Sequence, residues 1–143
     1  MSNGYPTLLH RWFDEVWNQK KASTIRELFT EDTVVHGLSG PGEDPVRGFE
    51  AFEKFHADFL TAFPDVYIVV DDVVTEGDKL AGRFTVTGTQ NGPLAEMPAT
   101  GKKTLFTGSG ICIVKDGKFT EIWNEIDFPK MQYDLAFDTP DLA

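Results

Sequence analysis

The chain has 143 residues, of which 41% are hydrophobic and twelve are phenylalanine, and these values predict one packed domain and argue against disorder. Its formal net charge of −10, from 23 acidic and 13 basic residues, argues against nucleic acid and anionic membranes as partners. No apolar run reaches the roughly 20 residues that span a bilayer, and the first residues lack the features of a signal peptide, so we expect a cytoplasmic protein.

The first part of the chain predicts helices and one short strand. Apolar residues at three- and four-residue spacing predict an amphipathic helix from about Thr7 to Gln19. Ser23 or Thr24 can cap a short second helix, and a third is expected over Phe49 to Ala62. The strand is expected at Thr33 to His36, and the Gly- and Pro-rich segment after it is expected to be a loop.

The sequence pattern changes to long strands after the third helix. Runs of β-branched and aromatic residues, separated by turn sequences, are expected at Val66–Val74, Leu80–Thr89, Lys103–Val114 and Lys118–Asp127. A short helix from about Pro129 to Ala136 would follow. Helices followed by strands predict a single α+β domain over residues 5–136, with a strongly bent antiparallel sheet wrapped around the three N-terminal helices. Residues 137–143 are expected to form a flexible tail.

The last predicted strand carries the most informative side chains. Because side chains alternate between the two faces of a strand, Trp123, Glu125 and Asp127 share one face. The surrounding Ile-, Trp- and Phe-rich sequence predicts a strand that is at least half buried, and a buried carboxylate is costly unless it is paired or neutral. A pocket that uses these acids is therefore the leading hypothesis.

Cysteine and histidine residues give no sign of a metal site. Cys112 lies in the apolar run I-C-I-V and is expected to be a buried apolar side chain rather than a nucleophile. The histidines, His10, His36 and His56, lack the spacing of zinc ligands, and His10 and His56 are expected to be solvated on helix surfaces. No metal and no cofactor are therefore expected.

Several short motifs occur in an order that is typical of one family. They are V-V-H-G at 34–37, G-F-E-A-F at 48–52, A-F-P-D at 62–65, G-T-Q-N-G at 88–92, P-A-T-G-K at 98–102 and D-G-K-F-T-E-I-W-N-E-I-D at 116–127. With these motifs, roughly residues 5–135 resemble the SnoaL-like polyketide cyclase group of the nuclear transport factor 2-like superfamily. The resemblance implies a cone whose apolar interior opens at one end, with catalytic groups on its inner wall.

The resemblance also implies a catalytic residue. In the cyclases an aspartate near the end of the last strand is the general acid/base of an intramolecular aldol ring closure, and Asp127 matches that position. An acid in an apolar cavity is a usable proton shuttle near neutral pH. The alternative is that Asp127 caps the helix that begins at Pro129. His36 either polarises a carbonyl or orients the acid, or it is a hydrogen-bonded structural residue.

Other side chains are candidates for substrate binding. Trp123 is expected to be a cavity wall or a core residue, and Glu125 either lines the cavity or faces solvent. Arg83 lies on a polar face that is either solvated or neutralises an interior carboxylate. Gln90 stands where the family often carries a histidine. Phe59 belongs to a helical stripe of phenylalanines that would add apolar contacts with a ligand.

Together these features predict an enzyme that needs no cofactor and acts on an apolar, oxygenated small molecule. Its reaction would be the aldol condensation of a polyketide-like carbonyl substrate, as in the resembling cyclases. The alternatives are a non-catalytic ligand-binding or dimerisation module, and an isomerase, lyase, ester cyclase or hydrolase that uses the same pocket. Because the second face of a bent sheet must be covered, we expect a homodimer.

Overall fold

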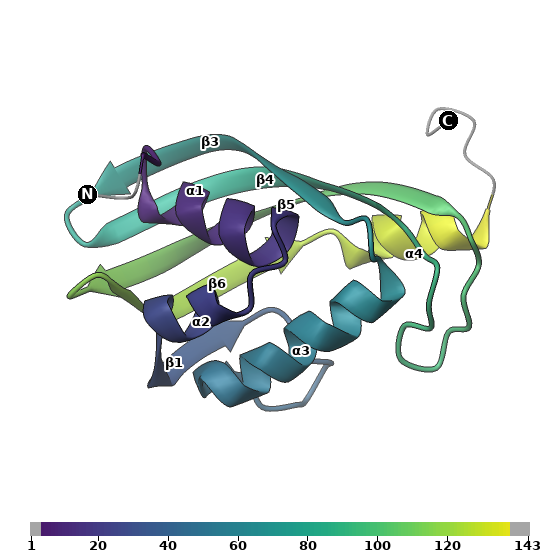
Figure 1. Cartoon of the computed structure of the whole chain (residues 1–143), viewed down its shortest axis with the longest axis horizontal. Coiled ribbons are helices and arrows are strands. Elements are labelled where there is room, and N and C mark those ends of the chain that lie inside the picture. The colour runs from purple at the N-terminus through teal and green to yellow at the C-terminus, as the bar shows by residue number, and fades with distance from the viewer. Residues whose placement is uncertain (1–3, 138–143) are drawn as a thin grey trace.

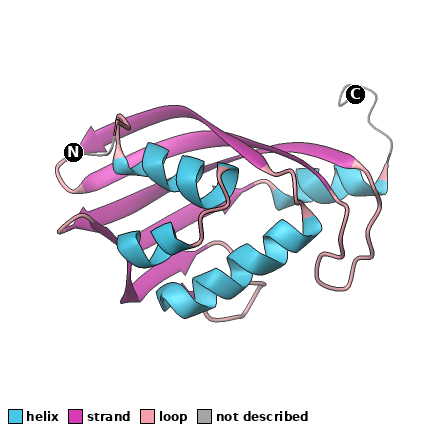
Figure 2. Cartoon of the chain, viewed as in Figure 1, coloured by secondary structure: helices cyan, strands magenta, loops and turns pink. Residues whose placement is uncertain are grey.

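A single curved sheet organises the fold, and the helices that precede its long strands lie on one face of it (Figure 1). The computed structural model describes residues 4–137. The strands follow the order β2-β1-β6-β5-β4-β3 across the sheet. Figure 2 shows the helices α1, α2 and α3 in front of the sheet and α4 beyond the end of β6. The predicted α+β cone is confirmed.

The helices agree with the sequence pattern in position but not in every detail. Their bounds are α1 (Leu8–Trp12), η1 (Phe13–Asn18), α2 (Ser23–Leu28), α3 (Gly48–Ala62) and α4 (Phe128–Ala136). The predicted first helix is thus α1 continued by η1, which is a π-helix. Neither of the two hydroxyls proposed as caps of α2 has that role, since the N-cap is Ala22. Thr24 is instead buried and donates a hydrogen bond of 2.7 Å to Glu15 Oε1.

The strands are those that the sequence predicts, with one addition. Their bounds are β1 (Phe29–His36), β2 (Val46–Arg47), β3 (Tyr67–Glu76), β4 (Lys79–Thr89), β5 (Lys103–Lys115) and β6 (Lys118–Ile126). The short β2 lies in the segment expected to be a loop. The β1–β6 pair is parallel and the other neighbouring pairs are antiparallel, so the expectation of a purely antiparallel sheet is wrong for that pair. The sequence of a single strand does not encode the direction of its neighbour.

Aromatic rings fill the space between the helices and the concave face of the sheet. Trp12 stacks on Phe29 with their ring centroids 4.8 Å apart, and Phe52 of α3 packs 5.1 Å from both. Such pairs add to the burial of a large apolar area. Gly48 allows α3 to begin here, because its φ is +80° and a Cβ atom would lie 2.7 Å from the carbonyl oxygen of Glu31. These contacts fix the helices over the sheet.

A buried carboxylate attaches α4 to β5. Asp134 is fully buried and accepts hydrogen bonds from the Lys130 ammonium at 2.7 Å, the Thr104 hydroxyl at 3.0 Å and the Leu105 N–H at 3.1 Å. Burial raises the pKa of Asp134, but these hydrogen bonds and the charge of Lys130 lower it more, so the pKa lies below its usual value. The carboxylate is therefore ionised and paired, and it holds α4 against the sheet.

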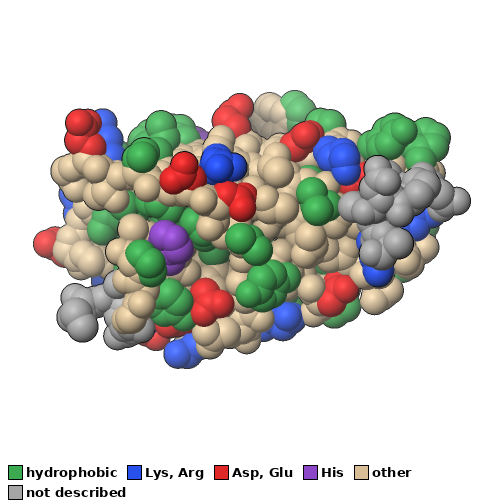
Figure 3. All heavy atoms as spheres, turned by 90° about the horizontal axis from the view of Figure 1, so that it is seen from above, with side chains coloured by type: hydrophobic (Ala, Val, Ile, Leu, Met, Phe, Trp, Pro, Cys, Tyr) green, Lys and Arg blue, Asp and Glu red, His purple; other side chains and the backbone are tan. Residues whose placement is uncertain are grey.

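The surface seen from above in Figure 3 mixes acidic, basic and hydrophobic side chains. Within residues 4–137, no helix is long and apolar enough to cross a membrane. The tail expected at residues 137–143 lies outside the described residues except for Phe137. The ring of Phe137 packs 4.9 Å from that of Tyr133.

Candidate functional site

A cavity of about 80 Å³ lies between the helices and the concave face of the sheet. The helices contribute rings to its lining, among them Trp12, Phe13, Trp17, Phe55 and Phe59. The sheet contributes mainly aliphatic and aromatic side chains, from β1, β3, β4, β5 and β6. Phe59 is buried and lines this cavity, and its contact with a substrate stays a prediction. The interior of the cone therefore provides an apolar, aromatic environment for a ligand.

The inward-facing side chains of β6 are not the ones that the sequence analysis favoured. Ile122, Asn124 and Ile126 line the cavity. The alternate residues, Trp123 and Glu125, are exposed and line a hollow on the opposite face of the sheet. The shared face was predicted correctly, and it points away from the cavity, which for Glu125 is the solvent-facing alternative. Apolar residues occur on both faces of β6, so the alternation alone does not say which face is inside.

Asp127 caps α4 on the outer side of the sheet. Its carboxylate accepts a hydrogen bond of 3.0 Å from the Lys130 N–H, and its own N–H donates to the Thr107 carbonyl oxygen at 2.9 Å. The side chain is exposed and borders a surface pocket with Arg83 and Glu125. The expected position of Asp127 on the cavity wall is therefore wrong, and the alternative of a helix cap is confirmed. The carboxylate thereby satisfies one of the free N–H groups in the first turn of α4.

Asn124 is the polar side chain that β6 presents to the cavity. Its Nδ2 donates a hydrogen bond of 3.3 Å to the His36 carbonyl oxygen. Gly110 makes room beside it on β5, because a Cβ atom there would lie 3.0 Å from Asn124 Oδ1 and 2.7 Å from the Trp123 carbonyl oxygen. An amide carries two N–H donors and an acceptor oxygen. Asn124 can therefore bond a ligand oxygen while it keeps its bond to β1.

Cys112 adds a thiol to the same wall. The side chain is buried, and this burial raises the pKa of the thiol to about 12. Cys112 is therefore a neutral, apolar wall residue near pH 7, as the sequence indicates. Among the described residues, the cavity lining includes no carboxylate, imidazole, lysine or arginine.

The remaining predicted site residues gather on the outer face of the sheet. His36 Nε2 lies 2.7 Å from Glu121 Oε2, and the His36 ring stacks on Trp123 with centroids 5.6 Å apart. Trp123 is 40% exposed, so the cavity wall and core positions expected for it are both wrong. Arg83 is exposed, and its Nε lies 3.9 Å from Asp72 Oδ2. Glu125 also faces solvent.

Gln90 has a structural position away from the cavity. The side chain is fully buried in the connection between β4 and β5, where its Oε1 accepts a hydrogen bond of 2.8 Å from the Thr100 hydroxyl. Its Nε2 donates to the Pro98 carbonyl oxygen at 3.3 Å. These bonds shape the connection, and they do not place Gln90 among the lining residues.

His56 packs against Trp17, one of the aromatic residues that line the cavity. Its Nε2 lies 2.6 Å from the Val16 carbonyl oxygen, which makes this nitrogen the N–H donor, and its ring packs 4.8 Å from Trp17. Only 3% of the residue is exposed, so the expected solvated position is wrong. Burial lowers the pKa of His56, which keeps the ring neutral near pH 7. The ring therefore fixes one of the aromatic walls.

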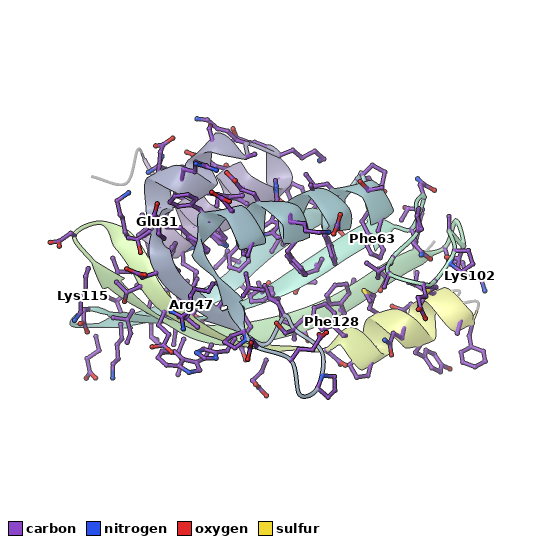
Figure 4. All side chains as sticks on the ribbon, turned by 90° about the horizontal axis from the view of Figure 1, so that it is seen from below. Glu31, Arg47, Phe63, Lys102, Lys115 and Phe128 are labelled. Atoms are coloured by element: carbon purple, nitrogen blue, oxygen red, sulfur yellow. The ribbon has the colours of Figure 1, made fainter. Side chains whose placement is uncertain are left out.

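Partly exposed lining residues mark where the cavity meets solvent. Leu38 follows β1, Phe55 lies on α3 and Phe128 begins α4, and each is half-buried. Figure 4 shows Phe128 at the start of α4, with α3 across the interior and Phe63 at the far end of that helix. We therefore identify Leu38, Phe55 and Phe128 as the mouth of the cavity.

The sequence contained partial signals for the residues that were missed. Trp12 and Trp17 belong to the apolar stripe of the first helix, but the stripe does not distinguish a core position from a cavity wall. Asn124 is a polar residue between Ile122 and Ile126, so its position on an apolar face was the available signal. Among residues 4–137, no group of three or more His, Cys, Asp or Glu side chains is placed to hold a metal ion.

Comparison with known proteins gives a consistent set of matches. The sequence matches the family of SnoaL-like polyketide cyclases over residues 7–135. IdmH from Streptomyces antibioticus, a candidate polyketide cyclase, is 30% identical, with a TM-score of 0.75. That match covers 88% of this chain and 94% of the chain of IdmH.

Other solved structures share the fold at lower identity. A candidate SnoaL-like polyketide cyclase from Jannaschia sp. CCS1 is 24% identical with a TM-score of 0.78, and the match covers 92% of this chain and 90% of that one. TsrD from Streptomyces laurentii is also 24% identical, with a TM-score of 0.77 over 90% of this chain and 91% of that one. These two likenesses concern the fold alone. The comparison with curated proteins gives no match.

Proposed function

Because the chain belongs to the SnoaL-like polyketide cyclase family, we propose that it is a cofactor-independent enzyme that closes a ring within an apolar, oxygen-bearing, polyketide-like molecule. Membership of this family supports a cyclase or a related enzyme of the same fold. The observation that carries the proposal is the position of Asn124, whose amide faces a cavity lined by aromatic rings. Such a cavity holds an apolar chain, and the amide orients one of its oxygens.

The proposed role of the cavity is to hold the substrate in a folded conformation. Rings from the helices and the apolar strand face exclude water and bring two parts of one chain together, which reduces the entropy cost of ring closure. Asn124 donates an N–H to the carbonyl oxygen on which negative charge grows as the new carbon–carbon bond forms. In an aldol closure the α-proton moves to that oxygen through the substrate's own oxygens or a bound water.

This proposal replaces the acid/base mechanism that the resemblance implied for Asp127. The carboxylate caps α4 and is not among the residues that line the cavity. Cys112 does not substitute for it, because a thiol with a pKa of about 12 is not ionised near pH 7. The catalytic contribution of the wall is therefore positioning and hydrogen bonding.

The size of the cavity constrains how a substrate enters. Pockets for drug-sized ligands hold roughly 300–1,000 Å³, and this cavity holds about 80 Å³. Since an apolar cavity of about 150 Å³ binds a single benzene ring, even a molecule of one or two rings requires this cavity to widen. A longer chain requires Leu38, Phe55 and Phe128 to swing outward at the mouth. We therefore expect a substrate-induced opening at these three residues.

A second candidate function is binding of an apolar small molecule without turnover. The neutral lining favours it, because hydrophobic contact and one hydrogen bond suffice for binding. The two candidates share the ligand class and the cavity. They differ in whether the protein converts the ligand into a product. A measurement of ligand binding and a measurement of product are therefore both needed.

Binding is tested with a matched pair of probes, 1-indanone and indane, which differ by one carbonyl oxygen. Fluorescence is recorded in a Trp123→Phe background, so that the signal comes from Trp12 and Trp17 at the cavity. Asn124→Leu should weaken 1-indanone binding about 3- to 10-fold, the usual worth of one hydrogen bond, and leave indane binding unchanged. Asp127→Asn is the control and should change neither affinity. Equal loss of both probes in Asn124→Leu would show only a damaged cavity.

Turnover is tested with synthetic poly-β-keto thioesters of increasing length, and ring-closed isomers are detected by chromatography and mass spectrometry. The proposal predicts product with the wild type and with Asp127→Asn, and a lower rate with Asn124→Leu. Because no group with a pKa between about 6 and 9 lines the cavity, the rate should be level across that range. Loss of product in Asp127→Asn with retention in Asn124→Leu would overturn the proposal. Binding without any product would favour the second candidate.

A further inference from the structure

The strands β4 and β5 carry four glycines, and all of them lie on the concave side of the sheet. They are Gly82, Gly88, Gly108 and Gly110, and Gly82 pairs with Gly110 across the two strands. Glycine weakens the middle of a strand, and it often marks a place where another group approaches the backbone closely. The group that lies over each glycine therefore indicates the role of that glycine.

Three of the four glycines make room for an apolar side chain of the core. A Cβ atom would come within 2.5 Å of Leu9 at Gly82, 3.2 Å of Phe63 at Gly88 and 2.7 Å of Phe84 at Gly108. These three positions are explained by the packing of the chain on itself.

Gly110 differs from the other three, because the nearest atoms are polar or belong to the backbone. A Cβ atom there would lie 2.7 Å from the Trp123 carbonyl oxygen, 3.0 Å from Asn124 Oδ1 and 3.7 Å from Asn124 Cα. Gly110 lines the cavity and lies opposite Asn124 in the pairing of β5 with β6. The missing side chain therefore leaves space in the cavity beside the amide oxygen.

The hydrogen bond of Asn124 decides which of its polar atoms borders that space. The Nδ2 group donates to the His36 carbonyl oxygen on β1, and β6 lies between β1 and β5. The nitrogen is thus directed toward β1 and the oxygen toward Gly110. Within residues 4–137, Oδ1 accepts no hydrogen bond from another residue. Because an amide oxygen only accepts hydrogen bonds, a ligand group that bonds to it must be a donor.

We propose that Asn124 Oδ1 and the open space over Gly110 form a subsite for a ligand hydroxyl, with Gly110 as the residue that determines this specificity. The inference rests on the proposed function and narrows its substrate to the enol form of a β-dicarbonyl compound. An enol carries its O–H on a planar carbon frame. Such a frame can lie against the backbone of Gly110, because no Cβ atom holds it away.

The enol is also the form that reacts in an aldol ring closure. Its carbon attacks the second carbonyl group and forms the new carbon–carbon bond, while the enol oxygen becomes a carbonyl oxygen. The enol O–H bond breaks, and its proton moves to the oxygen of the attacked carbonyl group, which becomes a hydroxyl. The product is therefore an isomer of the substrate. A hydrogen bond to Oδ1 strengthens as the O–H becomes more acidic during this step, so it favours the transition state.

Phenol and fluorobenzene test the subsite, because they are similar in size and differ in the O–H donor. Phenol carries its hydroxyl on a planar carbon, as an enol does, and a single ring requires the least widening of the cavity. Gly110→Ala should lower the ratio of phenol affinity to fluorobenzene affinity about 3- to 10-fold from its wild-type value, the usual worth of one hydrogen bond. Gly82→Ala adds the same methyl group on the neighbouring strand and should leave the ratio unchanged. Isothermal titration calorimetry measures both affinities, and an unchanged ratio in Gly110→Ala would overturn the inference.

A measurement on the wild type serves as a second test if Gly110→Ala does not fold. In the ¹³C,¹⁵N-labelled chain, phenol should move the Asn124 ¹³Cγ signal to higher frequency than fluorobenzene does, because a hydrogen bond to a carbonyl oxygen deshields its carbon. Equal effects of the two probes, or a wild type that does not bind phenol, would refute the subsite. Ring-closed product without a preference for the hydroxyl would refute the subsite and leave the proposed function standing. A preference for the hydroxyl without product would support the subsite and refute ring closure.

Discussion

At the scale of single residues, the direction in which a side chain of the last strand points decides whether it can contact a ligand in the cavity. Asn124 and Asp127 are three residues apart, yet one faces the apolar cavity and the other caps a helix at the surface. The carboxylate near the end of the last strand is therefore explained by the helix that follows it. The amide between two isoleucines bonds the His36 carbonyl oxygen with one N–H and also lines the apolar cavity, and this second position makes it the candidate for contact with a ligand.

The capping role of Asp127 predicts a difference between two substitutions. Asp127→Ala removes the acceptor of the Lys130 N–H and should lower the free energy of unfolding by about 1 kcal/mol. Asp127→Asn keeps an acceptor oxygen and should stay close to the wild type. Urea denaturation of the three proteins measures both values. Equal stability of the alanine and asparagine variants would show that the cap contributes nothing.

The buried His56 predicts a pH dependence of stability. Desolvation lowers the pKa of His56 below its usual 6.5 in the folded chain. Between the folded and unfolded pKa values the unfolded chain binds more protons, so the free energy of unfolding falls as the pH drops below about 6.5. His56→Gln keeps an N–H donor for Val16 and does not titrate. Stability of this variant should vary less than that of the wild type between pH 7 and 5, as measured by urea denaturation.

At the scale of elements, the sequence predicted the existence of helices and strands better than their contacts. The long strands β4 and β5 were placed to within a residue or so because their alternation is regular and their turns are marked by Gly and Asp. The pair β1–β6 and the short β2 were not predicted, because pairing direction and two-residue strands leave no local pattern. The π-helical form of η1 also depends on packing rather than on spacing.

The sequence predicted which of the candidate site residues lie near one another, but it did not predict on which face of the sheet they lie. The sequence grouped Trp123, Glu125, Arg83 and His36 as neighbours, and the structure brings them together, but on the outer face. A register shift opposite Ile113 and Val114 breaks the simple alternation of β6, so the buried Phe119 and Ile122 are both inward although they are three residues apart. An alternation rule applied without this irregularity cannot fix which face is buried.

The attachment of α4 predicts a large effect from one buried carboxylate. Asp134→Ala leaves the Thr104 hydroxyl and the Leu105 N–H without their acceptor and removes the partner of Lys130. The free energy of unfolding should fall on the order of 3 kcal/mol, the lower part of the range for a broken buried pair. The exposed pair of Lys54 and Asp58 is the control, because Asp58→Ala should cost well under 1 kcal/mol.

At the scale of the whole molecule, the sheet separates two different surfaces. The concave face and the helices enclose the cavity, and the outer face carries exposed side chains such as Trp123 and Arg83. A change on one face is therefore expected to leave the other face unaffected. Within residues 4–137, none of the charged side chains behind the net charge of −10 is among the residues that line the cavity.

The central claim is that ligands bind on the Asn124 side of β6, and side-chain and backbone NMR tests it directly. In a titration of the ¹⁵N-labelled chain with 1-indanone, the Asn124 amide and the indole N–H signals of Trp12 and Trp17 should shift. The indole of Trp123 and the backbone amide of Asp127 should not. Shifts confined to Trp123 and Asp127, with Asn124 unchanged, would place the ligand on the outer face and contradict the account.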